Sequence, residues 1–172
     1  MNWQTPQKLP DLRRVGIVAL DIETRDNGLH AGRGSAWPWG DGFAWREGGE
    51  IRSLYVPMRH PNTQNFDPAA VYRWLMDLVA SGVRIVTLNG IYDWGWLGSD
   101  GGILMPPSDH VEEVGALATI VDENQRRYSL DALCERYGLP GKDMALLNLE
   151  GIQHALACAA SRCHWPPRWS IW

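Results

Sequence analysis

The sequence predicts an α/β fold in which helices flank a mixed β-sheet. Two short apolar runs, residues 15–20 and 85–88, are typical of buried strands. Gly48-Gly49 separates two further strand-like stretches and indicates a β-hairpin. Amphipathic stretches follow the hairpin and alternate with the second buried run. A strand, a hairpin, a helix, a strand and then more helices together imply one mixed sheet with helices packed on it.

The bulk composition suits a single domain spanning residues 1–172, with a lead-in at 1–12 and an irregular tail at 161–172. The 45% hydrophobic content excludes a disordered chain. No apolar run approaches the roughly 20 residues that cross a bilayer, so we expect no membrane partner. The polar start is not a secretory signal, and three cysteines suit a reducing, cytoplasmic compartment. A net charge of −4 argues against wrapping of long duplex nucleic acid.

The first half of the chain is predicted as follows. Residues 13–21 form a strand that is buried on both faces, and residues 24–42, rich in glycine, form a loop. The hairpin arms are residues 43–47 and 50–58, so the first arm is short, which hints at an internal loss. A helix begins at Asp67 or Pro68 and ends at Gly82, with an apolar stripe at helical spacing.

The second half continues with a strand at residues 84–88, a helix at 91–97 and a loop at 98–108. Asp109 is expected to cap a helix at 110–121, and Ser129 a helix at 130–137 that Gly138 ends. Asp143 is expected to cap a last helix that continues to about residue 160. We find no internal repeat and no linker that divides the chain.

The first group of residues that suggests chemistry is Asp21-Ile22-Glu23, at the end of the first buried run. Residues i and i+2 of a strand project to the same face, so the two carboxylates would lie side by side. Close acids repel each other unless a cation or basic group is near. Most such pairs are solvated turn residues, and the buried strand is what favours a divalent metal site here.

The second group is Asn89-Gly90-Ile91-Tyr92-Asp93, which follows the second buried run. An acid in the first turn of a helix often does no more than complement the helix dipole. Asn89 is equally typical of a turn or a cap. Taken alone, Asp93 is therefore more simply a structural residue than a ligand.

Taken together, the two groups are far more specific. Their order, with the hairpin and helix between them, resembles the proofreading 3′–5′ exonuclease domains of family A DNA polymerases, in particular the phage type. Two further segments strengthen the resemblance: the Y-x-P-x-R-H-P run at 55–61 with Asn65, and the S-L-x-x-L…Y-G run at 129–138 with Lys142. The family belongs to the DEDD group, which implies a ribonuclease H-like fold.

The resemblance implies a two-metal hydrolysis of phosphodiester bonds with Mg²⁺ or Mn²⁺. Its catalytic and metal-binding residues would be Asp21, Glu23 and Asp93. Asn89, Thr24 and Tyr92 would contact the substrate, although Tyr92, like its neighbour Trp94, is more simply a core residue. The implied partners are the 3′ end of single-stranded DNA, with RNA as an alternative, and a DNA polymerase. The implied location is the cytoplasm of a bacterial or phage-infected cell.

One part of the family pattern is missing. The third motif, Y-x-x-x-D or H-x-x-x-x-D, supplies a fourth carboxylate, but no aspartate follows Asp143 and Glu150 is the one remaining acid. The run at 164–172 resembles the segment that precedes this motif, so we expect a chain that is truncated or has lost the motif. Impaired activity follows, and a catalytically dead nucleic-acid-binding or polymerase-partner module is the alternative.

Three weaker patterns remain. His154, Cys158, Cys163 and His164 form H-x3-C-x4-C-H, whose spacing fits no common zinc finger. Arg126-Arg127 is a solvated helix entry or a phosphate contact. Arg33 and the tryptophans at 37 and 39 form either one wall of a strand channel or a plain surface loop.

Overall fold

The computed structural model describes residues 6–25, 36–61 and 63–139. The elements in chain order are β1 (Ile17–Arg25), β2 (Trp37–Glu47), β3 (Glu50–Pro57), α1 (Pro68–Ala80), β4 (Arg84–Thr87), α2 (Gly90–Gly101), β5 (Val111–Glu113), α3 (Val114–Val121) and α4 (Leu130–Tyr137). The strands form one sheet in the order β3-β2-β1-β4-β5. Because β1 pairs antiparallel with β2 and parallel with β4, the sheet is mixed, as predicted.

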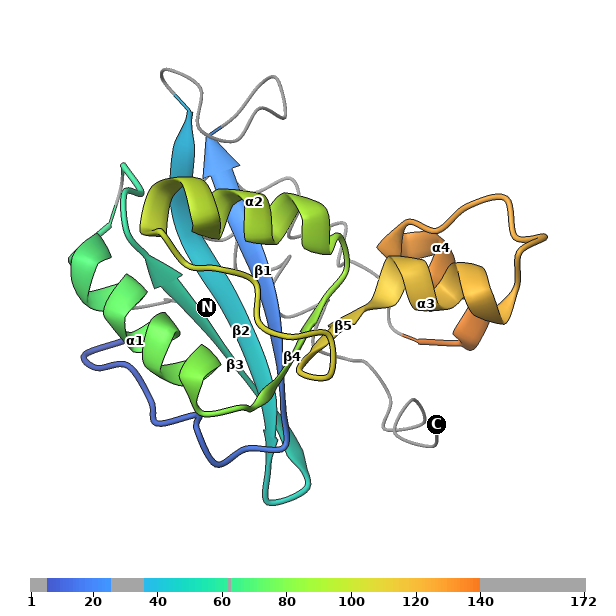
Figure 1. The fold of residues 1–172 in the computed structure, drawn as a ribbon, viewed down its shortest axis with the longest axis horizontal. Helices are drawn as coiled ribbons and strands as arrows, with labels where there is room; N and C mark the ends of the chain where they lie inside the picture. Colours follow the sequence, from blue (N-terminus) through green and yellow to red (C-terminus); the bar gives the residue numbers. More distant parts are fainter. Residues whose placement is uncertain (1–5, 26–35, 62, 140–172) are drawn as a thin grey trace.

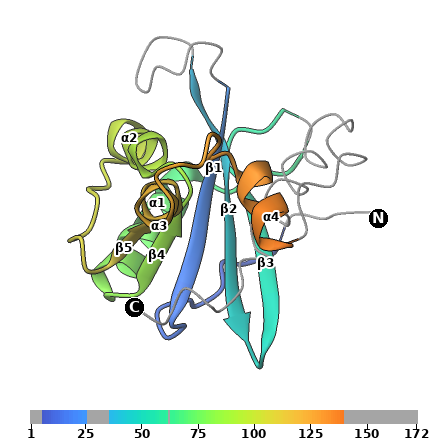
Figure 2. The same ribbon diagram turned by 90° about the vertical axis from the view of Figure 1, so that its right-hand side faces the viewer.

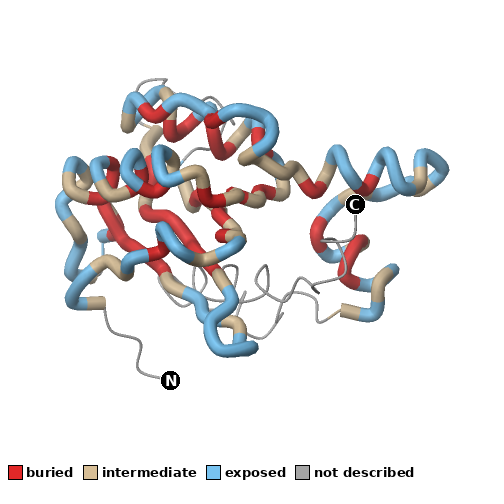
Figure 3. The backbone as a smooth tube through the Cα atoms, turned by 60° about the horizontal axis from the view of Figure 1, so that its bottom comes forward, coloured by how far each residue is buried: buried red, intermediate tan, exposed pale blue. Residues whose placement is uncertain are grey.

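Helices α1 and α2 cover one face of the sheet, whereas α3 and α4 project from its β5 side (Figures 1 and 2). The main core lies between the sheet and the two covering helices, where the tube in Figure 3 is largely buried. An edge-to-face contact between Phe43 of β2 and Trp74 of α1, with ring centroids 5.0 Å apart, joins the two layers. This arrangement confirms the predicted α/β class.

The central strand β1 differs from its prediction at both ends and on one face. It begins at Ile17 and continues to Arg25, so the two acids lie inside the strand rather than at its end. Val18, Leu20 and Ile22 are buried, but the residues that alternate with them are only partly buried. The prediction of full burial on both faces is therefore wrong, because the helices cover only the face to which Val18, Leu20 and Ile22 point.

The hairpin of β2 and β3 is confirmed, and its first arm is longer than predicted. Gly48 and Gly49 both adopt positive φ, 59° and 87°, as a two-residue turn of this kind requires. However, β2 begins at Trp37, so residues 37–42 belong to the sheet and not to a loop. The prediction of a short first arm is wrong, because Gly40 and Gly42 are paired with both β1 and β3, and the internal loss inferred from that arm loses its basis. The rest of the predicted loop, residues 26–35, lies outside the described residues.

Helix α1 forms as the sequence predicts. The Asp67 side chain accepts a hydrogen bond from the Ala69 N–H, and Pro68 occupies the first turn. Val71, Leu75 and Leu78 are buried against the sheet, which is the apolar stripe expected from helical spacing. The helix is therefore held by a local cap and by packing together.

The end of the predicted lead-in is part of the packed structure. Leu12 is 1% exposed and belongs to the main core. The backbone carbonyl of Pro10 accepts a hydrogen bond of 2.8 Å from the Trp74 indole on α1. The segment from Pro10 to Leu12 is thus anchored beside α1.

The second half of the chain corrects two predicted boundaries. Helix α2 runs to Gly101, beyond the predicted end at residue 97. Residues 111–113 form β5, parallel to β4, so the predicted helix at 110–121 begins only at Val114 and Asp109 is not its cap. A three-residue strand carries too little periodicity to be seen in a sequence, and it forms here because the β4 edge supplies its backbone partners.

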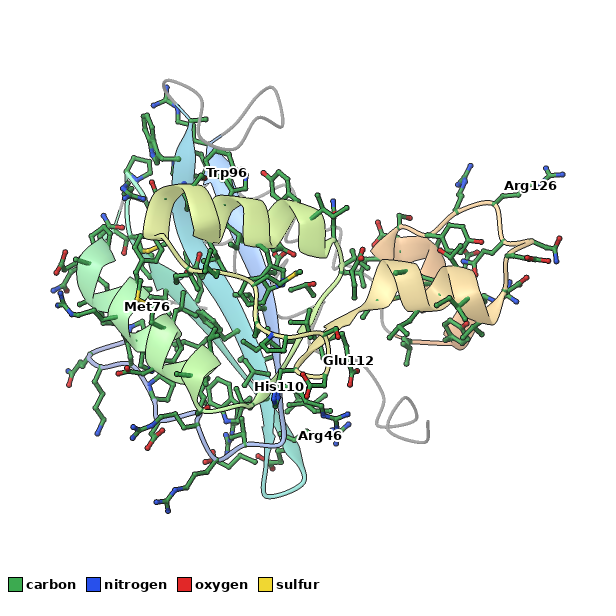
Figure 4. The ribbon with its side chains drawn as sticks, viewed as in Figure 1. Arg46, Met76, Trp96, His110, Glu112 and Arg126 are labelled. Carbon is green, nitrogen blue, oxygen red and sulfur yellow. The ribbon has the colours of Figure 1, made fainter. Side chains whose placement is uncertain are left out.

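Helices α3 and α4 pack on each other around a small second core formed by Val114, Ala118 and Leu133. The Ser129 side chain accepts from the Ala132 N–H and Gly138 ends α4 in a left-handed conformation, both as predicted. Figure 4 shows Arg126 at the outer end of this pair, away from the sheet. The predicted helix from Asp143 and the irregular tail lie outside the described residues.

In the parts of the chain that the structure describes, no helix is both long enough and apolar enough to span a membrane.

Replacing Asp67 by alanine removes the cap of α1 and should lower the free energy of unfolding by about 1 kcal/mol. Denaturation by urea, followed by circular dichroism, measures the change. Asparagine caps about as well as aspartate, so Asp67→Asn is the matched control and should unfold close to the wild-type midpoint. Equal destabilisation by both substitutions would contradict the capping role.

Candidate active site

The two acids of β1 stand opposite glycines of β2. In the β1–β2 register, Asp21 pairs with Gly42 and Glu23 with Gly40. Directly paired residues of antiparallel strands project to the same face. Both carboxylates therefore lie on the face that α1 and α2 leave uncovered, and no bulky β2 side chain crowds them. A bulge after Glu23 then changes the register.

Asp93 approaches this region from a different element. It lies in the first turn of α2, which follows β4 directly, and it is 3% exposed. The recorded pairing of β1 with β4 ends at Ala19, and the Asp93 carboxylate accepts a hydrogen bond from the Ile22 backbone N–H beyond that point. Asp93 thus supplies a hydrogen-bond partner to the β1 backbone beyond the end of its pairing with β4.

The environment of Asp93 disfavours its charge. Burial raises its pKa to about 7, the hydrogen bond from Ile22 lowers it, and the negative charges of Glu23 and Glu113 raise it further. The carboxylates of β1 and α2 are therefore close enough to interact electrostatically. A bound cation would favour the ionised form of Asp93.

Glu113 is an acid that sequence analysis missed, because it was placed inside a helix. It is the last residue of β5 and pairs with Thr87, the last residue of β4. The parallel strands β4 and β5 thus end beside each other and bring Glu113 toward Asp93. No sequence signal marks this position, since the β5 segment is only three residues long.

The predicted substrate-binding residues occupy different environments. The Thr24 hydroxyl and the Tyr92 hydroxyl hydrogen-bond to each other, which joins β1 to α2. The Tyr92 ring also packs edge-to-face on Trp96, with centroids 6.3 Å apart. Asn89 is exposed at the N-cap position of α2, and its side chain makes no capping hydrogen bond. Trp94 is buried in the main core, as its simpler interpretation predicted.

The far end of α2 is fastened to the sheet side by a polar cluster. Asp100 forms a 2.7 Å ion pair with Arg59, which follows β3, and accepts a hydrogen bond from the Tyr72 hydroxyl of α1. A Cβ on Gly101 would lie 2.7 Å from the Tyr72 ring, so the helix passes very close to α1 here. These contacts fix the helix that carries Tyr92 and Asp93.

A second buried acid, Asp41, lies in the core rather than at the site. It pairs with Ile22 on one side and Val56 on the other, and it is fully buried. Neither carboxyl oxygen has a hydrogen-bond partner among the described residues. Burial raises its pKa to about 8, and the charges of Asp93 and Asp100 add to the effect, while Arg59 opposes it. Asp41 is therefore mainly protonated at neutral pH.

The carboxylates suit a divalent metal in donor chemistry, because hard Mg²⁺ and Mn²⁺ prefer oxygen ligands. The raised pKa of Asp93 beside Glu23 is the electrostatic situation that a cation would relieve. Across the described ranges, however, no three His, Cys, Asp or Glu side chains are grouped closely enough to hold a metal ion. The residues thus fit an ion in chemistry and in charge, without forming a ready-made three-ligand group.

Other predicted candidates do not join this region. Arg126 lies at the outer end of the α3–α4 pair (Figure 4). Trp37 is a strand residue of β2, and Arg25 stacks on its ring at 4.8 Å. Arg33 and the four candidate zinc ligands at 154, 158, 163 and 164 lie outside the described residues.

The chain was compared with known proteins by sequence and by structure. No protein-family model matches the chain. A DNA-directed DNA polymerase of Pseudomonas phage M6 is 30% identical over 165 residues, which cover 90% of this chain and 24% of the phage protein. The structure of Brucella melitensis NrnC with bound Mg²⁺ superposes with a TM-score of 0.58 at 16% identity, over 90% of this chain and 69% of NrnC.

The chain shares its fold with NrnC. The match to a phage DNA polymerase agrees with the resemblance drawn from its two acid motifs, and the predicted α/β class is confirmed. The chain spans about a quarter of the length of the phage polymerase that it matches.

The buried acid Asp41 should make stability fall as pH rises. Its pKa of about 8 in the folded protein exceeds the ordinary value of 3.8, so the folded state holds a proton that the unfolded state has released. The free energy of unfolding should therefore decrease by about 1.4 kcal/mol per pH unit for this group between about pH 4 and pH 8. Urea denaturation over this range, without added metal, measures the slope.

Asp41→Asn should remove this contribution, because the amide is neutral at every pH and similar in shape. Asp93 adds a slope of the same sign up to about pH 7, which should remain in the variant. Asn in place of the exposed Asp131 is the control and should leave the profile unchanged. An unaltered slope in Asp41→Asn would show that Asp41 ionises normally.

Proposed function

We propose that the chain is a metal-dependent 3′–5′ exonuclease domain that hydrolyses phosphodiester bonds at the 3′ ends of DNA. The observation that carries this proposal is the approach of Asp93 on α2 to Glu23 on β1, close enough for Glu23 to raise the pKa of Asp93. An acid of the first motif thus interacts electrostatically with the acid of the second motif, which lies in the first turn of α2.

The proposed metal ligands are Asp21, Glu23 and Asp93. Two Mg²⁺ or Mn²⁺ ions, when bound, would stabilise the attacking and leaving oxygens of an in-line displacement at phosphorus. The chain supplies the carboxylates and sets their spacing through the β1 strand and the first turn of α2. Binding requires the ionised form of Asp93, so we expect metal affinity to increase as pH rises through about 7.

Asn89, Thr24 and Tyr92 are the proposed substrate contacts. Asn89 is exposed at the N-terminus of α2, ahead of Asp93 in the chain, and its side chain makes no capping hydrogen bond. The hydrogen bond to Thr24 and the contact with Trp96 fix the orientation of the Tyr92 ring, so a substrate would meet the ring in one orientation. A fixed aromatic and an exposed amide suit the terminal nucleotide of a single strand.

The compared proteins support the same proposal without assigning an activity to this chain. The phage relative is described as a DNA polymerase, which favours DNA as the substrate and a polymerase as the partner. The NrnC structure holds Mg²⁺, which favours a divalent cofactor. DNA rather than RNA is the proposed substrate because the phage relative has the higher sequence identity.

A second candidate function is a nucleic-acid-binding module that keeps the fold and lacks the chemistry. One observation favours it: the described residues contain no group of three metal-binding side chains. A module of this kind would bind single strands without metal, and its affinity would fall steeply with salt.

The nuclease proposal predicts release of mononucleotides from a 3′-labelled single-stranded DNA when Mg²⁺ or Mn²⁺ is added. We expect slow release from a chain that offers the ions three carboxylates, those of Asp21, Glu23 and Asp93. Asp21→Ala should reduce the rate by more than about a hundredfold, since several kcal/mol of transition-state stabilisation would be lost. Timed gel electrophoresis of the labelled strand measures the rate.

Asp131→Ala, on the exposed side of α4, is the matched control and should keep the wild-type rate. A rate that Asp21→Ala leaves unchanged would reject the assigned site. Metal-independent binding of the strand with no release of nucleotides would favour the binding module. Faster release from the ribo-oligomer of the same sequence would reassign the substrate to RNA.

A further inference from the structure

Tyr55 of β3 lies in the same transverse row as the first acid. Asp21, Gly42 and Tyr55 stand opposite one another in β1, β2 and β3. Glu23 and Gly40 are opposite each other in the next row. Because paired residues of antiparallel strands share a face, the Tyr55 side chain emerges on the same face as the acids, one row away from Glu23.

The end of the Tyr55 side chain leans into the Glu23 row. A Cβ placed on Gly40 would lie 2.7 Å from the Tyr55 hydroxyl oxygen and 2.8 Å from the ring carbon that bears it. The phenol end thus occupies the space that any other residue at position 40 would fill with its own side chain. Gly40 is the gap into which Tyr55 fits.

That position brings the hydroxyl toward Glu23, although the hydroxyl and Glu23 Oε1 do not hydrogen-bond to each other in this structure. Cβ atoms of directly paired residues are about 5 Å apart, so a group seated where the Gly40 Cβ would be lies within reach of a glutamate side chain on the paired position. The electrostatics agree: burial raises the pKa of the Tyr55 phenol, and the charge of Glu23 raises it further. Tyr55 is fully buried and its phenol stays protonated, so the group it can offer to Glu23 is a hydrogen-bond donor and not a base.

We propose that Tyr55 is a positioning residue for Glu23: when a divalent ion binds, the hydroxyl in the gap at Gly40 donates a hydrogen bond that orients the Glu23 carboxylate toward the ion. This inference rests on the proposed function. It explains two features together, the Gly-Asp-Gly sequence inside a strand and a fully buried phenol on the acid face. Groups that orient a ligating carboxylate commonly affect metal affinity by about 10- to 100-fold when removed.

Tyr55→Phe tests the inference, because it keeps the ring in the gap and removes only the hydroxyl. We expect Mn²⁺ affinity to fall by roughly tenfold, measured from the electron paramagnetic resonance signal of free Mn²⁺. In the nuclease assay kcat should fall while KM for the oligonucleotide stays constant. The midpoint of thermal unfolding, followed by circular dichroism, shows that the variant is folded.

Tyr128→Phe is the matched control. The Tyr128 hydroxyl donates a 2.8 Å hydrogen bond to the Asp122 carbonyl in the α3–α4 pair, so its removal deletes a comparable bond away from the acids. It should leave Mn²⁺ affinity unchanged. In addition, Tyr55→Phe should have little further effect in a Glu23→Gln background, because the hydroxyl acts through the Glu23 carboxylate.

The outcomes separate the two proposals. If Asp21→Asn loses Mn²⁺ binding and Tyr55→Phe binds like the wild type, the role of Tyr55 is rejected and the metal site stands. Additive effects of Tyr55→Phe and Glu23→Gln would also reject it. If the wild-type chain binds no Mn²⁺, the proposed function fails and this inference fails with it.

Discussion

The register between β1 and β2 is the constraint on which the rest of the structure depends. In that register Leu20 and Ile22 face the helices, whereas Asp21 and Glu23 face away from them. A slip of one residue would exchange the two faces, exposing the apolar side chains and placing two carboxylates in the core. The burial of one set of side chains thus determines the direction of the other.

The two glycines of β2 belong to the same constraint. Gly42 and Gly40 lie opposite the two acids, and the end of the Tyr55 side chain occupies the space that a side chain at position 40 would take. Glycine in a strand interior weakens the strand, because it has a high conformational entropy in the unfolded chain and no side chain to pack. At position 40, glycine leaves the room that the buried Tyr55 phenol fills.

The parallel side of β1 contributes the remaining acids. Because β4 runs parallel to β1 and ends early, the chain turns into α2 beside the middle of β1, and it turns into α3 at the end of β5. The first turn of α2 therefore brings Asp93 to the Ile22 N–H, and the end of β5 brings Glu113 near it. Ligands commonly bind at the carboxyl ends of parallel strands for the same geometric reason. Asp41, by contrast, is an acid of the core and tolerates burial by remaining protonated.

The sequence by itself determined the local elements whose signals are contained in a few neighbouring residues. These are the Gly48-Gly49 turn, the cap and apolar stripe of α1, and the Ser129 cap and Gly138 end of α4, and the order of the elements was enough to indicate the α/β class. The acid motifs Asp21-x-Glu23 and Asp93 could also be recognised in the sequence, because their residue types and their order along the chain are specific. Only the tertiary structure decided that residues 37–42 are a strand, that 111–113 pair with β4, and that Tyr55 and Glu113 approach the acids. These features depend on backbone partners and cross-strand neighbours that are distant in the chain, and no local pattern of side chains encodes them.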